Sequence, residues 1–147
     1  MTSLLFLALV ACSPSSPDAA SSDVVADFGA EKSTQSGKYR VSIAFEPSPP
    51  VMSELFVARA VVKDRAGEPI EDATVALNAT MPHHGHGMMT SPRDEPGVCD
   101  DEGTCTHPGG VYETSGFKFH MGGPWTVTAV VTGPNGVDDT SFIYEMQ

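Results

Sequence analysis

Residues 38–46 of this chain read Lys-Tyr-Arg-Val-Ser-Ile-Ala-Phe-Glu, and apolar side chains occupy every second position from Tyr39 to Phe45. This alternation is typical of a β-strand with one buried face, because successive side chains of a strand point to opposite sides. The same period recurs along the rest of the chain, weakly in one place, around 87–92. We expect strands near residues 38–46, 54–64, 70–80, 87–92, 111–119, 125–132 and 138–146.

The residues between these stretches favour turns, as in Asp64-Arg-Ala-Gly67 and Gly133-Pro-Asn-Gly136. No stretch has a sustained helical period, and the 12 prolines of the chain argue against one. The pattern therefore predicts an all-β fold, an immunoglobulin-like antiparallel β-sandwich of about seven strands. A closed barrel is the alternative, but the irregular stretch 92–110 fits a sandwich better. We expect Trp125 to be a core residue at a strand start.

The N-terminus indicates export. An apolar run from Leu4 to Val10 ends in small residues and Cys12, and it is too short for a membrane helix, which needs about 20 apolar residues. Residues 9–12, Leu-Val-Ala-Cys, resemble the bacterial lipobox, which implies that Cys12 is lipidated and becomes the first residue of the mature chain. The alternative is an N-terminal strand or helix. No Lys or Arg precedes Leu4, unlike most signal peptides.

These features predict three parts of the chain. They are a signal peptide over 1–11, a lipidated disordered stalk over 12–37 that is rich in Ser, Ala, Asp and Pro, and a domain over 38–147. We expect a lipoprotein of the cell envelope, anchored to the membrane through its N-terminal lipid and facing the periplasm or the cell surface.

The other two cysteines, Cys99 and Cys105, form an even pair once Cys12 carries the lipid. In an oxidising compartment such a pair is expected to form a disulfide bond. Two thiolates that bind a metal ion are the alternative.

The charge of the chain excludes one class of partner. Its net charge is −11, from 8 Lys and Arg against 19 Asp and Glu. Because polyanions are bound mainly by Lys and Arg, nucleic acid is not expected as a partner.

Residues 81–89 read Met-Pro-His-His-Gly-His-Gly-Met-Met and hold three of the five histidines and three of the seven methionines. Imidazole nitrogen binds Cu(II), Zn(II) and Ni(II), whereas the thioether of Met selects Cu(I). In an extended chain the side chains of His84 and His86 fall on one face. His83 faces the other way and is better explained as a turn residue.

A second cluster, His120-Met121, follows the predicted strand 111–119. If strands run alternately up and down, and a strand near 87–92 exists, both clusters emerge at the same end of the sandwich. His84, His86 and His120, with Met88 or Met121, would then converge on one ion. The alternative is that the histidines are turn residues and the methionines fill gaps. We expect His107 to be a solvated loop residue.

Three segments, 64–75, 81–87 and 116–125, resemble the YtkA-like and FixH-like family of exported sandwich domains, and the resemblance extends from about Lys38 to the C-terminus. The family is associated with copper handling and with assembly of respiratory oxidases. The resemblance implies a copper site formed by His84, His86, Met88, His120 and Met121.

Two functions are therefore weighed. The first is a carrier or chaperone for a transition metal, copper by the resemblance, which exchanges its ion with an envelope donor or acceptor protein. The second is a metal-free interaction module of the envelope. An enzyme is not expected, because the sequence has neither a nucleophile-elbow serine nor carboxylates paired at a recognisable spacing. It also lacks the cysteine ligand of a blue-copper site.

Overall fold

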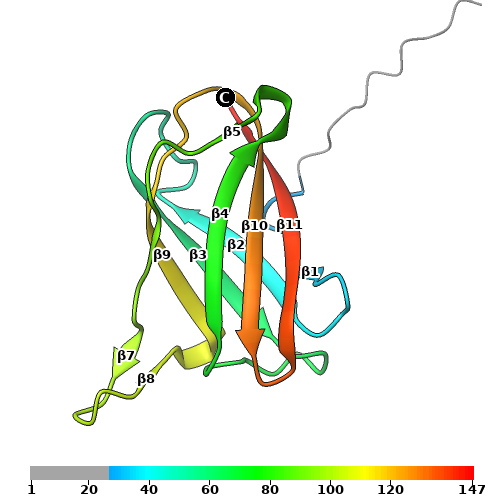
Figure 1. The fold of residues 1–147 in the computed structure, drawn as a ribbon, viewed down its shortest axis with the longest axis vertical. Coiled ribbons are helices and arrows are strands. Elements are labelled where there is room, and N and C mark those ends of the chain that lie inside the picture. The colour runs from blue at the N-terminus through cyan, green and yellow to red at the C-terminus, as the bar shows by residue number, and fades with distance from the viewer. Residues whose placement is uncertain (1–26) are drawn as a thin grey trace, which may run out of the picture.

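Two antiparallel sheets packed face to face form the body of the protein in the computed structural model, which describes residues 27–147 (Figure 1). One sheet has the strand order β1-β2-β3-β9-β6 and the other has the order β11-β10-β4-β5. The first sheet contains β1 (Lys32–Ser33), β2 (Arg40–Glu46), β3 (Phe56–Lys63), β6 (Arg93–Asp94) and β9 (Val111–Phe117). The second contains β4 (Thr74–Met81), β5 (His86–Gly87), β10 (Gly123–Gly133) and β11 (Gly136–Met146).

The long strands form because their apolar residues alternate. In β4 every second residue from Val75 to Met81 is buried, and β2 and β3 follow the same pattern. The buried faces of both sheets meet in one core that includes Trp125, Phe117, Phe119 and Phe142, each fully buried. The predicted all-β antiparallel sandwich is confirmed, and so is the core position of Trp125. Strand β10 begins two residues before Trp125.

The N-terminal segment of the described chain packs on the sandwich. The ring of Phe28 stacks on Phe45, with ring centroids 4.2 Å apart, and contacts Tyr144 edge-on at 5.1 Å. Strand β1 pairs with β2, and the Asp27 carboxylate accepts a hydrogen bond of 2.6 Å from the Ile143 amide in β11. The prediction of a disordered stalk is therefore wrong for residues 27–37. These residues are mostly polar, but Phe28 among them packs against the core and holds the segment on the sandwich.

The remaining N-terminal predictions fall outside the described residues: the signal peptide 1–11, the lipidation of Cys12 and the first part of the stalk. Within residues 27–147, no helix has the length and apolar character needed to cross a bilayer.

Between β4 and β9 the chain differs from the expected single strand at 87–92. It forms β5 and β6, each of two residues, and a hairpin of β7 (Val98–Cys99) and β8 (Cys105–Thr106) that projects from the body (Figure 1). Because β6 pairs antiparallel with β9, the chain still descends the length of the sandwich before β9 rises. The Sγ atoms of Cys99 and Cys105 lie 2.05 Å apart, at bonding distance.

This descent brings the ends of β4 and β9 to the same end of the molecule. Thr80, near the end of β4, pairs with Thr126, near the start of β10, and β10 follows directly from the turn after β9. We call this end, formed by residues 81–89 and 118–123, the histidine pole. In Figure 1 it lies at the top, around β5 and the C-terminus.

Candidate functional site

The first loop of the histidine pole is a tight reversal. Strand β4 ends at the buried Met81, and Pro82 begins a single 3₁₀ turn, η1 (Pro82–His84). Gly85 then adopts the left-handed conformation with φ of +67° and donates its N–H to the Met81 carbonyl at 3.0 Å. Glycine suits this position because other residues are strained there. His86 consequently pairs back with Met81 in β5.

This reversal brings His84 and His86 together, with ring centroids 5.8 Å apart. The predicted proximity is therefore found, but the reason given for it, an extended chain, is wrong. The two rings approach through a turn, because Pro82 favours the turn and Gly85 allows the chain to fold back. His83 and His84 are both exposed.

The second loop carries His120 to the same place. The ring centroids of His86 and His120 lie 5.2 Å apart, and both rings lie against Trp125, at 6.3 and 5.5 Å. The Trp125 indole N–H donates to the Met121 carbonyl at 3.0 Å, which holds the loop over the core. The structure thus places the ring of His86 near those of both His84 and His120, and whether the three histidines act as metal ligands remains a prediction.

One nitrogen of this cluster lacks a partner. Nδ1 of His120 is shielded from solvent, and no group of residues 27–147 hydrogen-bonds to it. A buried polar atom left in this way costs about 1–3 kcal/mol, so most are satisfied. His86 differs, because its Nδ1 lies 3.2 Å from the Gly87 carbonyl and can donate to it. In that tautomer its Nε2 is the acceptor nitrogen.

Several methionines of the described residues gather around the same pole. Met88 and Met121 are partly buried and pack against the core, as does Met81, which is 1% exposed. Met146, the last residue of β11, pairs with Gly123 at the start of β10. The methyl group of Met52 lies 3.7 Å from where a Cβ on Gly122 would be. Met52 and Met146 were missed by the sequence reasoning, although the alternation of strand directions would have placed the end of β11 at this pole.

The donor set of the pole is limited to imidazole and thioether groups. In the part of the chain that is described, no group of three or more His, Cys, Asp or Glu side chains is arranged to hold a metal ion. A metal at the histidine pole would therefore need Met sulfur as well as imidazole nitrogen. Such mixed ligation suits copper better than zinc or a hard cation, and the unpartnered His120 Nδ1 fits this set.

His107 lies elsewhere and is not the solvated loop residue that was expected. Its ring stacks on Tyr112 with centroids 4.1 Å apart, and its Nδ1 lies 3.2 Å from the Val111 carbonyl. The ring is partly buried because residue 107 closes the hairpin segment back onto β9. The sequence around His107 does not predict its contacts with Val111 and Tyr112, because they depend on how the loop folds back onto β9.

Of the comparisons with known proteins, one found a match. The family model described as YtkA-like matches residues 33–130, which include both loops of the histidine pole. Neither a curated protein nor a solved structure matches the chain. Because the match spans well over half of the sequence, this chain belongs to the YtkA-like family.

Proposed function

We propose that this protein is an extracytoplasmic lipoprotein that binds a transition metal, copper, at the histidine pole and acts as a carrier or chaperone for it. The residues that would hold the ion are His84, His86 and His120, with sulfur from Met88 or Met121. Bound copper would be the cargo of the protein and not a catalytic group, so we propose no enzymatic activity.

The observation that carries the proposal is the pairing of His86 with His120. The two rings come from loops 34 positions apart in the sequence, yet their centroids lie 5.2 Å apart, and the Nδ1 of His120 is buried without a partner. A histidine kept only for packing would be expected to satisfy that nitrogen. An ion at the pole would supply the missing interaction.

The exposure of the pole supports transfer of the ion in preference to permanent storage. His120 lies partly buried above Trp125, whereas His84 is exposed on η1. An incoming protein could therefore replace the outer ligand first, while the inner one still holds the ion. We propose that the partner is an envelope protein that donates or accepts the metal.

The envelope location is part of the same proposal. It is supported by the lipobox-like segment that ends at Cys12 and by the even pair of remaining cysteines, Cys99 and Cys105, since disulfide bonds persist in oxidising compartments. The lipid on Cys12 would attach the domain to the membrane, with the pole facing the periplasm or the cell surface.

Calorimetric titration of the full chain, carrying Cys12→Ser so that it stays unlipidated, tests the proposal with Cu(I) and Cu(II). We expect about one equivalent of copper to bind, as for a single site, and the double variant His86→Ala/His120→Ala to lose this binding. His83→Ala is the matched control, because His83 lies in the same loop but is exposed and is not one of the proposed ligands. Equal binding by the double variant and the control would discard the site.

The alternative, a metal-free interaction module, is favoured by one observation: no trio of His, Cys, Asp or Glu side chains in residues 27–147 is arranged for a metal. In that case the domain would melt at the same temperature with and without copper, because only a ligand of the folded state raises the melting temperature.

A further inference from the structure

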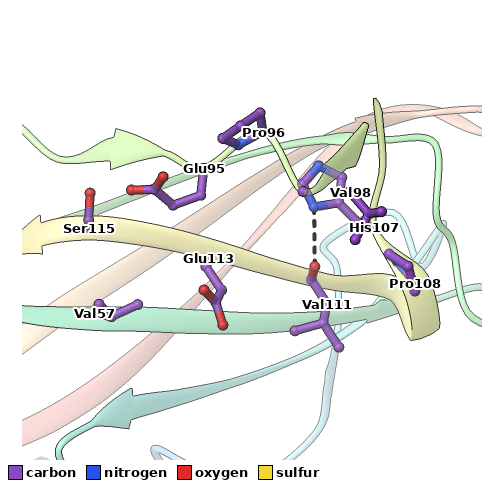
Figure 2. A pocket seen from close by; sticks show the side chains of 10 residues that line it. Val57, Glu95, Pro96, Val98, His107, Pro108, Val111, Glu113 and Ser115 are labelled. Atoms are coloured by element: carbon purple, nitrogen blue, oxygen red, sulfur yellow. Dashed lines mark hydrogen bonds between the residues drawn. The ribbon is translucent and has the colours of Figure 1, made fainter. Parts of the chain in front are cut away.

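A second site lies on the outer face of the five-stranded sheet, where a cavity of about 610 Å³ opens between the strands and the hairpin segment (Figure 2). Its floor is formed by outward-facing residues of β3 and β9, namely Val57, Val111, Glu113 and Ser115. Its wall is formed by residues 95–98 and 107–108, which enter and leave the β7–β8 hairpin.

The wall is attached by backbone hydrogen bonds to strand β9 and to the loop between β3 and β4. The Glu95 amide donates to the Glu113 carbonyl at 2.8 Å, and the His107 amide donates to the Glu71 carbonyl at 2.9 Å. The stacking of His107 on Tyr112 adds a third attachment. The cavity is therefore a formed feature of the fold, and the hairpin does not have to move to create it.

The lining of the cavity has two chemically different ends. Figure 2 shows Glu95 and Ser115 toward one end and Val98, Pro108 and Val111 toward the other, with Glu113 between them. No Lys or Arg lines the cavity. Arg59 directs both of its hydrogen bonds to Oε1 of Glu113, and the ion pairs of the described chain do not include Glu95. Glu113 is therefore already paired with Arg59, whereas Glu95 has no ion-pair partner among the described residues, and its carboxylate favours a cation.

The acidic surface continues beyond the cavity along the hairpin. Its tip carries Asp100, Asp101 and Glu102, all exposed, and Val98 at its base is 64% exposed. A small amine in the cavity would reach none of the tip carboxylates. An extended basic segment would contact the cavity and the hairpin tip at the same time. The carboxylates of the cavity and of the hairpin tip are therefore complementary in charge to a basic segment of another protein.

We propose that this cavity, together with the hairpin, binds a basic segment of a partner protein and takes one Lys or Arg side chain between the hairpin and the sheet. The aliphatic stem of that side chain would lie against Val98, Pro108 and Val111, while its cationic head would reach the carboxylate of Glu95. The hairpin and η2 (Pro108–Gly110) lie at the opposite end of the molecule from β5 in Figure 1. A docked partner therefore leaves the histidine pole open.

A peptide titration followed by NMR tests this assignment on the full chain carrying Cys12→Ser. The probe is acetyl-Gly-Leu-Lys-Leu-Arg-Gly-amide, and the comparison peptide has Glu in place of Lys and Arg. We expect saturable shifts of the backbone amides of residues 95–98 and 111–115 with the basic peptide only. Because a charged hydrogen bond is lost, Glu95→Lys should weaken binding by about tenfold or more.

The matched control is Glu54→Lys, which makes the same change in net charge at an exposed position in the β2–β3 loop. It should bind the basic peptide as the parent chain does. A second variant, Val98→Ser, removes the apolar wall at an exposed position and should also weaken binding. Copper binding by Glu95→Lys should stay unchanged, which separates this test from that of the histidine pole.

Three results would overturn the proposal. The first is equal binding of the acidic peptide, and the second is equal weakening by Glu54→Lys and Glu95→Lys, which would mean that only net charge matters. The third is binding of n-butylammonium as tightly as the peptide, which would assign the cavity to a small amine.

Discussion

Replacing His120 by phenylalanine should stabilise the metal-free protein and at the same time abolish its response to copper. Nδ1 of His120 is buried without a hydrogen-bond partner in the described chain, and such an atom costs about 1–3 kcal/mol. The ring of Phe keeps the edge-on contact with Trp125 that His120 makes at 5.5 Å and has no nitrogen to leave unpaired.

The expected size of the effect follows from the length of the domain. Unfolding entropy is about 2.1 cal/mol/K per residue, so a domain of about 120 residues has about 0.25 kcal/mol/K. Allowing for imperfect packing of the larger ring, a gain of about 1–2 kcal/mol then raises the melting temperature by about 4–8 °C. A ligand at one hundred times its Kd adds about 2.7 kcal/mol, which would raise the melting temperature of the parent chain by about 10 °C and that of the variant not at all.

Differential scanning calorimetry of the parent chain and of His120→Phe, each with and without copper, measures both effects. His120→Leu serves as a second replacement, because it removes the nitrogen while adding less volume than phenylalanine does. If both variants melt lower than the parent in the absence of metal, His120 is a structural residue and its unpaired nitrogen does not indicate a ligand. If the variants still respond to copper, the ion binds elsewhere.

Three further outcomes are expected. Burial alone would raise the pKa of Asp138, but hydrogen bonds from the Thr34 hydroxyl and from backbone amides outweigh it and hold the pKa well below the ordinary value of 3.8. The stabilisation is therefore complete above that value and declines as the pH falls below it. Denaturant midpoints measured downward from pH 6 should fall less steeply in Asp138→Asn. Phe28→Ala should destabilise the domain by about 1–2 kcal/mol, less than a fully buried Phe because Phe28 is only partly buried, and trypsin should then cleave at Lys32 sooner. Without reductant, mass spectrometry after alkylation should find Cys99 and Cys105 unlabelled, and labelling of both would disprove the predicted disulfide bond.

The long strands could be predicted from sequence because a strand buried on one face has an apolar residue at every second position. In β2, β3, β4 and β10 every second residue is buried and apolar over most of the strand, and such a run is difficult to obtain by chance. In β11 two of the buried residues, Asp138 and Thr140, are polar. Counting the directions of the strands was enough to predict that the two histidine loops meet. This prediction of a shared end is correct because β6 runs antiparallel to β9, so that one descending segment separates β4 from β9. That segment contains only two paired residues instead of the expected strand at 87–92.

Features formed by short or irregular segments have no such periodic pattern and could not be predicted. A strand of two residues such as β1 or β6 has no period, and the packing of Phe28 depends on Phe45 and Tyr144, which lie far away in the sequence. The cavity beside Glu95 was missed for the same reason, because residues 95–98 contribute to it only by returning onto the face of the sheet. The unpartnered nitrogen of His120 depends on its surroundings in three dimensions and could not be read from its position in the chain.

The chain contains a single tryptophan, and that residue lies beneath both His86 and His120. Its fluorescence therefore reports on the histidine pole without any added label, because an ion bound at the imidazoles would alter the surroundings of the indole or quench its emission. A peptide bound at the other end of the sandwich should leave the emission unchanged. One optical signal can thus tell the two proposed binding events apart in the same sample.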